Sequence, residues 1–203
     1  MKIIAIGGEP ATGKTEIIRK IRENENKPKV KSFGLLQYEV VRSRKTIYLG
    51  RYKGHKFDGT DRLSMAVQGD AKKFMKIAEN RYSGYTIIFE GDRLFNKSFL
   101  TFLFKYQPVI IIVATSEKIA KSRHKKREDT QKQTFLKSRK TKILNIAAKF
   151  PYIRVYNNNK EDLKNIVNLI NTLIKVKKRD FISIFKTERE VGLRALSKKH
   201  KFW

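Results

Sequence analysis

Residues 8–15 read Gly8-Glu9-Pro10-Ala11-Thr12-Gly13-Lys14-Thr15, directly after the apolar run Ile3-Ile4-Ala5-Ile6 and before a helical pattern. They match the phosphate-loop pattern G-x-x-x-x-G-K-[ST], whose glycines let backbone N–H groups surround a chain of phosphates. In that pattern Lys14 reaches the β- and γ-phosphates, and the Thr15 hydroxyl binds Mg²⁺. The N-terminus of the following helix attracts the same anion. The sequence therefore predicts that residues 8–15 together bind Mg-ATP or another nucleoside triphosphate.

Strand-like and helical patterns alternate from residue 2 to residue 174. Strands are expected at 2–6, 35–41, 46–52, 85–89, 109–114 and 152–156, and helices at 16–23, 68–80, 117–150 and 161–174. The second and third strands are expected to form a hairpin, because the short charged turn 42–45 separates two runs rich in Val, Ile and Tyr. Continuous apolar runs such as 85–89 and 109–114 are typical of buried parallel strands. We therefore expect one α/β domain over residues 1–174, with a doubly wound parallel sheet.

The segments beside these patterns are less regular. Polar residues 23–32 are expected to form a connection. Residues 175–203 are expected to form a basic C-terminal extension rather than a second domain. Within it, residues 181–185 suit a further strand, and residues 187–198 suit a helix whose first turn resembles a capping box.

Composition restricts the class of protein. Cysteine is absent from the 203 residues, which excludes disulfides, a thiol nucleophile and cysteine-based metal sites. No apolar run approaches the ~20 residues of a membrane helix, and no secretory signal pattern follows Met1. The expected location is therefore the cytoplasm, with no membrane partner.

The formal charge of +28 comes from 47 Lys and Arg against 19 Asp and Glu. Such an excess predicts a polyanionic partner, because a kinase that acts on small nucleotides does not need it. The excess is uneven, because residues 117–149 hold 12 basic and 3 acidic residues and residues 175–203 hold 10 and 3. A lysine-rich composition without any bound polymer is the alternative.

Asp58-Gly59-Thr60-Asp61-Arg62 lies where the topology brings a loop to the carboxyl ends of the strands, the ligand-binding edge of open α/β sheets. A carboxylate there can accept the proton of an acceptor hydroxyl, and an adjacent arginine can hold a phosphate. Asp61 is the predicted base and Arg62 the predicted clamp, with Asp58 as a second candidate. The alternative is an Asp-Gly turn followed by a helix cap.

Glu90-Gly91-Asp92-Arg93 follows the apolar run 85–89. Phosphate-loop enzymes place their second acidic motif at the end of such a strand, where it orients Mg²⁺ directly or through water. Glu90 is predicted to fill that role, while Asp92 and Arg93 face the acceptor. A salt-bridged strand end is the alternative.

The basic region 117–149 is predicted to be a lid that closes on the phosphates. Arg123 and Arg127 fall on one face of a helix, with Arg139 and Lys140 further along. Closure would let these arginines neutralise charge on the transferred phosphoryl group, whereas the alternative for each is a solvated surface position. Four aromatic residues, Tyr82, Phe95, Phe99 and Phe135, are candidate stacking surfaces, although a place in the core is the commoner role.

Asn159-Lys160-Glu161-Asp162 matches the N-K-x-D pattern of GTPases. The chain lacks the D-x-x-G sequence that such proteins use for the γ-phosphate. Asn159 is equally explained as a helix cap, with acidic residues in the first turn. A GTPase is therefore not favoured.

The motifs, taken in order, resemble the phage-encoded P-loop kinases that act on 5-hydroxymethyluracil in DNA. The resemblance is carried by the phosphate loop, Gly59-Thr60-Asp61-Arg62-Leu63-Ser64, Phe89-Glu90-Gly91-Asp92-Arg93-Leu94-Phe95, Arg123, Arg127, Thr134-Phe135-Leu136-Lys137 and Thr141-Lys142. It spans residues 2–174 and leaves the extension without a counterpart. It implies the P-loop kinase fold and an ATP- and Mg²⁺-dependent enzyme that phosphorylates the hydroxymethyl group of a base already in DNA.

Three other functions share part of this pattern. A nucleotide or nucleoside kinase has the same fold, loop and lid, but does not need the positive charge. A polynucleotide 5′-hydroxyl kinase also has a DNA substrate and an Asp/Arg pair. A DNA-binding ATPase without transferase activity needs only the basic surface, and leaves Asp61 and Arg62 unexplained.

Overall fold

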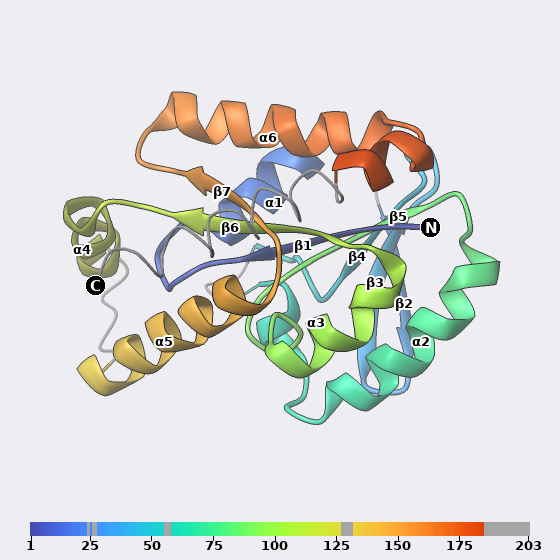
Figure 1. The fold of residues 1–203 in the computed structure, drawn as a ribbon, viewed down its shortest axis with the longest axis horizontal. Helices are drawn as coiled ribbons and strands as arrows, with labels where there is room; N and C mark the ends of the chain where they lie inside the picture. Colours follow the sequence, from blue (N-terminus) through green and yellow to red (C-terminus); the bar gives the residue numbers. More distant parts are fainter. Residues whose placement is uncertain (24, 26–27, 55–57, 127–131, 185–203) are drawn as a thin grey trace.

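The computed structural model of the chain describes residues 1–23, 25, 28–54, 58–126 and 132–184. In this part of the chain a seven-stranded sheet lies between two layers of helices (Figure 1). The strands are β1 (Lys2–Gly7), β2 (Lys29–Phe33), β3 (Leu36–Val41), β4 (Thr46–Leu49), β5 (Thr86–Glu90), β6 (Val109–Ala114) and β7 (Ile153–Tyr156). The helices are α1 (Lys14–Arg22), α2 (Val67–Arg81), α3 (Lys97–Leu103), α4 (Glu117–Lys126), α5 (Gln133–Lys149) and α6 (Lys160–Lys175), with short 3-10 helices η1 (Thr60–Arg62) and η2 (Phe104–Tyr106).

The strand order is β2-β3-β4-β5-β1-β6-β7. The five adjacent strands β4, β5, β1, β6 and β7 are parallel to one another. Strand β3 pairs antiparallel with β2 and with β4. The predicted α/β class, the mainly parallel sheet and the β3–β4 hairpin are therefore confirmed. The strands whose sequences are continuous apolar runs, β5 and β6, lie on either side of β1 in the middle of the sheet, where both faces are buried.

The structure differs from the sequence-based expectation at strand β2 and at helix α3. Residues 29–32 were expected to be part of a connection, but they belong to strand β2. This strand lies at the edge of the sheet and is largely exposed, so its sequence Lys-Val-Lys-Ser-Phe lacks the apolar run that identifies a buried strand. The short helix α3 was not expected. It begins at Asn96, whose side-chain Oδ1 accepts the Phe99 N–H at 3.0 Å, and it buries Phe99, Leu100 and Leu103 against the sheet.

Each face of the sheet has its own hydrophobic core. Helices α2, α3 and α5 cover one face, and their buried residues pack with Ile3, Ala5 and Ile87. Helices α1 and α6 cover the other face, where they meet Ile4, Ile6 and their neighbours. Figure 1 shows these two layers above and below the sheet. Tyr82, Phe95 and Phe99 are buried, so the core role holds for these three aromatic residues.

Helix α6 is fastened at both ends. At its start the Asn159 side chain accepts the Asp162 N–H at 2.8 Å, so this residue is the helix cap that the sequence offered as an alternative to a GTPase motif. At its end the buried Lys2 Nζ donates to the carbonyl oxygens of Leu173 at 3.0 Å and Val176 at 2.7 Å. A cation at the carbonyl end of a helix is favourable for the helix dipole.

Residues 178–184 are helical, so the strand expected at 181–185 is wrong. Phe181 is buried against the α1–α6 core, and its N–H donates to the Lys177 carbonyl oxygen at 3.0 Å. Burial of a single aromatic side chain is compatible with either structure, and a mostly apolar run of five residues is too short to distinguish a strand from a helix. The helix expected at 187–198 lies outside the described residues. Across the described ranges, no helix has the length and apolarity to cross a membrane.

Candidate active site

Residues 8–13 form a loop between the end of β1 and the start of α1. Positive φ angles at Gly8 (148°), Ala11 (61°) and Gly13 (89°) turn the backbone sharply. A Cβ at Gly8 would lie 2.2 Å from the Val113 carbonyl oxygen, and a Cβ at Gly13 would lie 2.4 Å from Asn157 Nδ2. Both glycines are therefore required by backbone conformation and by space.

The carbonyl groups of this loop are held by side chains from several directions. Lys14 Nζ donates to the carbonyl oxygens of Gly8 at 2.9 Å and Glu9 at 2.8 Å. Arg123 Nη1, from α4, donates to the Ala11 carbonyl oxygen at 3.2 Å, and Asn157 Nδ2 donates to that of Thr12 at 2.9 Å. Because its carbonyls are engaged in this way, the loop has a fixed backbone shape next to the N-terminus of α1.

Thr15 and Glu90, the two predicted magnesium ligands, are in contact. Thr15 Oγ1 donates to Glu90 Oε1 at 3.1 Å, although 75 residues separate them in sequence. Glu90 is 1% exposed at the end of β5, and burial raises the pKa of its carboxyl to about 7, with Lys14 opposing the rise and Asp61 adding to it. Oxygen ligands of this kind suit Mg²⁺, which takes few protein ligands and keeps water or phosphate oxygens for the rest.

The loop that carries Asp61 is attached to the end of β5. The Thr60 hydroxyl donates to the Glu90 carbonyl oxygen at 2.8 Å, and Gly59 forms an isolated bridge with Arg51. A Cβ at Gly59, where φ is 79°, would lie 2.3 Å from Glu90 Oε1. The glycine thus lets this loop approach the buried carboxylate closely.

Asp61 lies in η1 beside the backbone of Asp92. Its Oδ1 accepts the Asp92 N–H at 2.5 Å. Burial raises the pKa of the Asp61 carboxyl, and the nearby charge of Asp92 raises it further, while Lys14 and Arg93 act in the opposite direction. A general base works best when its pKa lies near the working pH, and the raised pKa of Asp61 is closer to neutral pH than that of an ordinary aspartate.

The Asp92 side chain pairs with two cations of α5. Its Oδ2 lies 2.8 Å from Arg139 Nε, and its Oδ1 lies 3.0 Å from Lys142 Nζ, which also donates to the Asp92 carbonyl oxygen at 3.1 Å. The Arg139 guanidinium stacks over Phe135, with 4.5 Å to the ring centroid. Helix α5 is therefore joined to the loop after β5, and Asp92 links that helix to Asp61.

Asp58 occupies a different position from Asp61. Its carboxylate is buried and accepts from Arg19 Nη2 at 2.9 Å and from the backbone N–H of Gly54 at 3.0 Å. Burial acts to raise the pKa of this carboxyl, but the hydrogen bonds from Arg19 and from the Lys53 and Gly54 amides outweigh it and leave the pKa lowered. These contacts fasten the loop to α1.

The two remaining acceptor-side arginines lie next to the Asp61 segment. Arg93 Nε donates to the Leu63 carbonyl oxygen at 3.3 Å. Arg62 follows Asp61 in η1, and its Nη1 atom is buried without a hydrogen-bond partner among the described residues. An arginine nitrogen in that condition is suited to an anionic group of a ligand.

The structure brings most of the predicted residues to the carboxyl edge of β1 and β5. Lys14, Thr15, Glu90 and Asp61 interact there, with Arg123 above the loop and Arg139 on the acceptor side. Arg127 lies outside the described residues. In the described chain, no group of three or more His, Cys, Asp or Glu side chains is placed to hold a metal ion by itself.

Two residues of the site were not predicted. Asn157 directly follows β7 and is 3% exposed, so its place at the end of a parallel strand was a signal that the sequence offered. Lys142 lies three residues after Arg139 and shares a face of α5 with it, which helical spacing indicates. That Asp92 pairs with both Arg139 and Lys142 is visible only in the folded chain.

Comparison with known proteins adds no family assignment. No protein-family model matches this chain, and no curated protein matches it.

Proposed function

We propose that this chain is an ATP-dependent kinase that transfers the γ-phosphate to the hydroxymethyl group of 5-hydroxymethyluracil in DNA. The observation that supports the proposal is the contact between Thr15 and Glu90 with Asp61 close by, because a phosphate-loop kinase needs Mg²⁺ ligands and a base near its lysine, here Lys14. The choice of acceptor rests on the motif resemblance and on the charge of +28.

On the donor side, the N–H groups of residues 8–15 and the ammonium group of Lys14 bind the phosphates. Thr15 and Glu90 would hold Mg²⁺, which when bound would neutralise charge on the phosphate oxygens. Lys14 and Arg123 donate to loop carbonyls at 2.8–3.2 Å, so both cations lie beside the loop proposed to bind the phosphates.

On the acceptor side, an Asp61 oxygen takes the proton of the hydroxymethyl group as the hydroxyl oxygen bonds to the γ-phosphorus. The bond from that phosphorus to the β-phosphate oxygen breaks, and ADP leaves with the electron pair. The Asp92 N–H holds Asp61 Oδ1, which leaves Oδ2 for the proton. Arg62 and Arg93 hold phosphate groups of the acceptor strand.

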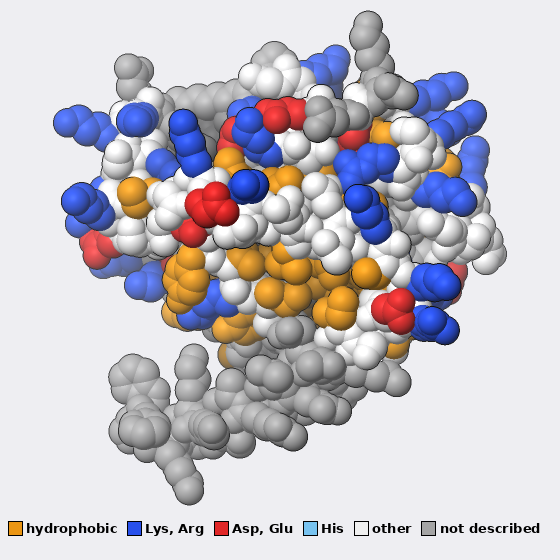
Figure 2. Space-filling model, turned by 90° about the horizontal axis from the view of Figure 1, so that it is seen from above, with side chains coloured by type: hydrophobic (Ala, Val, Ile, Leu, Met, Phe, Trp, Pro, Cys, Tyr) orange, Lys and Arg blue, Asp and Glu red, His pale blue; other side chains and the backbone are white. Residues whose placement is uncertain are grey.

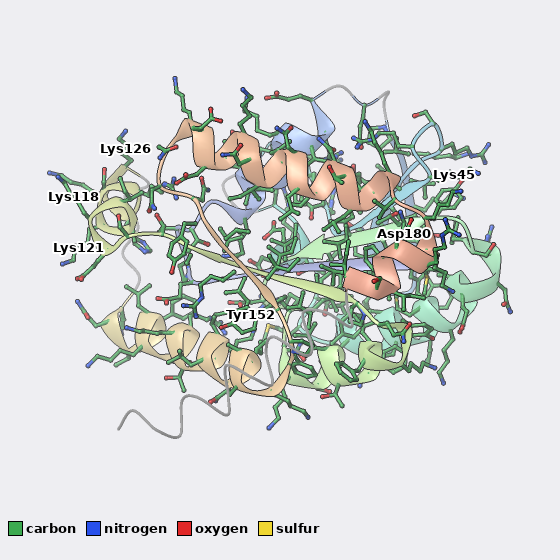
Figure 3. All side chains as sticks on the ribbon, turned by 45° about the horizontal axis from the view of Figure 1, so that its top comes forward. Lys45, Lys118, Lys121, Lys126, Tyr152 and Asp180 are labelled. Carbon is green, nitrogen blue, oxygen red and sulfur yellow. The ribbon has the colours of Figure 1, made fainter. Side chains whose placement is uncertain are left out.

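A DNA acceptor accounts for the charge of the two helices beside the site. Helices α4 and α5 together carry ten Lys and Arg and one Glu. Figure 3 shows Lys118, Lys121 and Lys126 pointing outward from α4. A free nucleotide has too few phosphates to need such a surface, whereas a polymer meets it at many points.

The test is a transfer assay with Mg²⁺ and γ-labelled ATP against four acceptors: duplex DNA with internal 5-hydroxymethyluracil, unmodified duplex, 5′-hydroxyl oligonucleotides, and a mixture of nucleosides and monophosphates. Label on the modified DNA alone is expected. Label on 5′ ends or on monophosphates refutes the proposed acceptor, and label on none of the four refutes a kinase for these acceptors.

A further inference from the structure

Strand β7 lies at one end of the sheet, and within the described part of the chain no strand pairs with its outer edge. Ile153 and Val155 pack toward the core beneath α1 and α6, whereas Arg154 and Tyr156 are exposed. Successive side chains of a strand alternate between faces, so Arg154 and Tyr156 share the opposite face with Tyr152. Tyr152 packs at the margin of the core beneath α5, which agrees with that assignment.

These three residues, Tyr152, Arg154 and Tyr156, form what we call the β7 ladder. Arg154 Nη2 donates to the Tyr152 hydroxyl at 3.2 Å, and its guanidinium carbon lies 5.7 Å from the Tyr152 ring centroid. Tyr156 is 56% exposed, a high value for a large aromatic side chain. Alternate residues are about 6.6 Å apart along a strand, so the ladder offers flat groups in regular succession.

The ladder leads to the candidate active site. Tyr156 directly precedes Asn157, whose amide holds the Thr12 carbonyl group of the loop. Helix α5 enters β7 through residues 150–152 and carries five basic and no acidic residues. Figure 3 shows Tyr152 between α5 and α6 at the start of this strand. Figure 2 shows the α6 side of the molecule, across the sheet from Arg154 and Tyr156, where Lys and Arg side chains are scattered among Asp, Glu and hydrophobic side chains.

We propose that the β7 ladder is a stacking surface for the exposed bases of single-stranded or locally opened DNA. The proposal rests on the proposed function in taking DNA as the polymer. Aromatic rings and guanidinium planes bind the flat faces of bases, and a closed duplex hides those faces. A kinase that acts on a base must draw it out of the stack, and the opened neighbouring bases then need a surface of this kind.

The test measures binding of fluorescein-labelled oligothymidylate by anisotropy, without ATP, over a series of salt concentrations. Tyr156→Ala is expected to weaken binding about 5- to 150-fold, the range for loss of one stacking side chain. Tyr156→Phe keeps the ring and should bind as the wild type does. Arg154→Ala should weaken binding and reduce the slope of log K against log salt by about 0.7.

Arg81→Ala is the matched control. Arg81 is also exposed and stacked on a tyrosine, with 5.8 Å to the Tyr82 ring centroid, but it lies on α2, which packs on β2 and β3 at the other end of the sheet. It should leave oligothymidylate binding unchanged. Wild-type affinity in Tyr156→Ala, or equal losses in Arg154→Ala and Arg81→Ala, would overturn the proposal.

The transfer assay separates this inference from the proposed kinase. Label on modified DNA with undiminished binding by Tyr156→Ala refutes the ladder alone. Binding that depends on Tyr156 without transfer to any acceptor refutes the kinase alone and leaves the ladder as a DNA-binding surface.

Discussion

The donor side and the acceptor side of the candidate site are built in different ways. The donor side is built around one continuous segment, residues 8–15, whose shape comes from glycines and backbone turns, and Glu90 contacts it through Thr15. The acceptor side is assembled from residues 58–62, residues 91–93 and helix α5, which meet only in the folded chain. A binding site formed by one continuous loop can be recognised in the sequence. A site formed by residues far apart in sequence depends on how distant elements pack together.

The two basic helices, α4 and α5, contact different sides of the candidate site. Helix α4 reaches the donor loop through Arg123, and α5 reaches the acceptor loop through Arg139 and Lys142. In the described part of the region predicted to be a lid, two helices, α4 and α5, thus make separate contacts, one with the 8–15 loop and one with Asp92. Substitutions on either side should therefore separate nucleotide binding from transfer.

Asp61→Asn should give the largest effect and break the acceptor side alone. Loss of the general base is expected to lower kcat for phosphoryl transfer by about 10²–10⁴-fold. Binding of Mg-ATP, measured by calorimetry, should stay at the wild-type value because the 8–15 loop is unchanged. Asp180→Asn, at an exposed residue paired with Arg179, is the control. Full activity in Asp61→Asn would refute this residue as the base.

Glu90→Gln should make the protein more stable than the wild type at high pH, because it removes a carboxyl group that is unfavourable when it is ionised in the buried site. The pKa of Glu90 is about 7 in the folded state against 4.5 unfolded, so the folded protein holds a proton that the unfolded chain releases between these values. Wild-type stability therefore falls as pH rises through this window, and the variant lacks that loss.

We expect Glu90→Gln to gain on the order of 3 kcal/mol over the wild type between pH 4.5 and pH 8. In thermal melts of the ligand-free protein at pH 8, the melting temperature of Glu90→Gln should be roughly 5–10 °C above that of the wild type. A constant difference in melting temperature from pH 4.5 to pH 8 would contradict the raised pKa.

Lys142→Met should act on the acceptor side through Asp92. It removes a cation 3.0 Å from Asp92 Oδ1, and a small displacement of Asp61 follows. Transfer is expected to fall by about 10- to 100-fold in kcat, with KM for ATP unchanged. Lys142→Arg should restore most of the rate. Lys149→Met removes a lysine of the same helix that bonds Thr101 on α3, and should leave the rate unchanged.

Asn157→Ala should give the smallest effect and loosen the donor side. It leaves the buried Thr12 carbonyl oxygen without the amide that lies 2.9 Å away, which costs about 1–3 kcal/mol of stability. The melting temperature should drop by several degrees, and ATP affinity should fall with it. Asn165→Ala, at an exposed position of α6, is the control. Unchanged ATP affinity in a destabilised Asn157→Ala would show that the loop keeps its shape without this contact.

Much of the fold followed from local patterns. Strands with continuous apolar sequences, such as β6, and the amphipathic helix α6 were predicted because their burial is uniform or periodic. Strand β2 and helix α3 were not, because an exposed edge strand with two lysines lacks the first signal and a seven-residue helix lacks the second. Thr15 and Glu90 were each predicted to bind Mg²⁺ from separate sequence motifs, and the structure shows that their side chains are in contact.

The acceptor side was predicted by residue type but not by contact. Asp61, Asp92 and Arg139 were all candidates, yet the bonds that join them depend on how α5 packs against the loop after β5. Asp58 looks equivalent to Asp61 in sequence, and only the structure shows that Arg19 and two amides surround its carboxylate.

Mass spectrometry of the reacted DNA tests the central claim most directly. DNA containing 5-hydroxymethyluracil is incubated with wild-type protein and Mg-ATP, digested to nucleoside 5′-monophosphates with nucleases and no phosphatase, and analysed beside the same DNA treated with Asp61→Asn. We expect a new nucleotide with the mass of one further phosphate on the 5-hydroxymethyl group, present with the wild type and almost absent with the variant. Recovery of 5-hydroxymethyldeoxyuridine 5′-monophosphate alone, despite bound ATP, would contradict the proposed phosphoryl transfer.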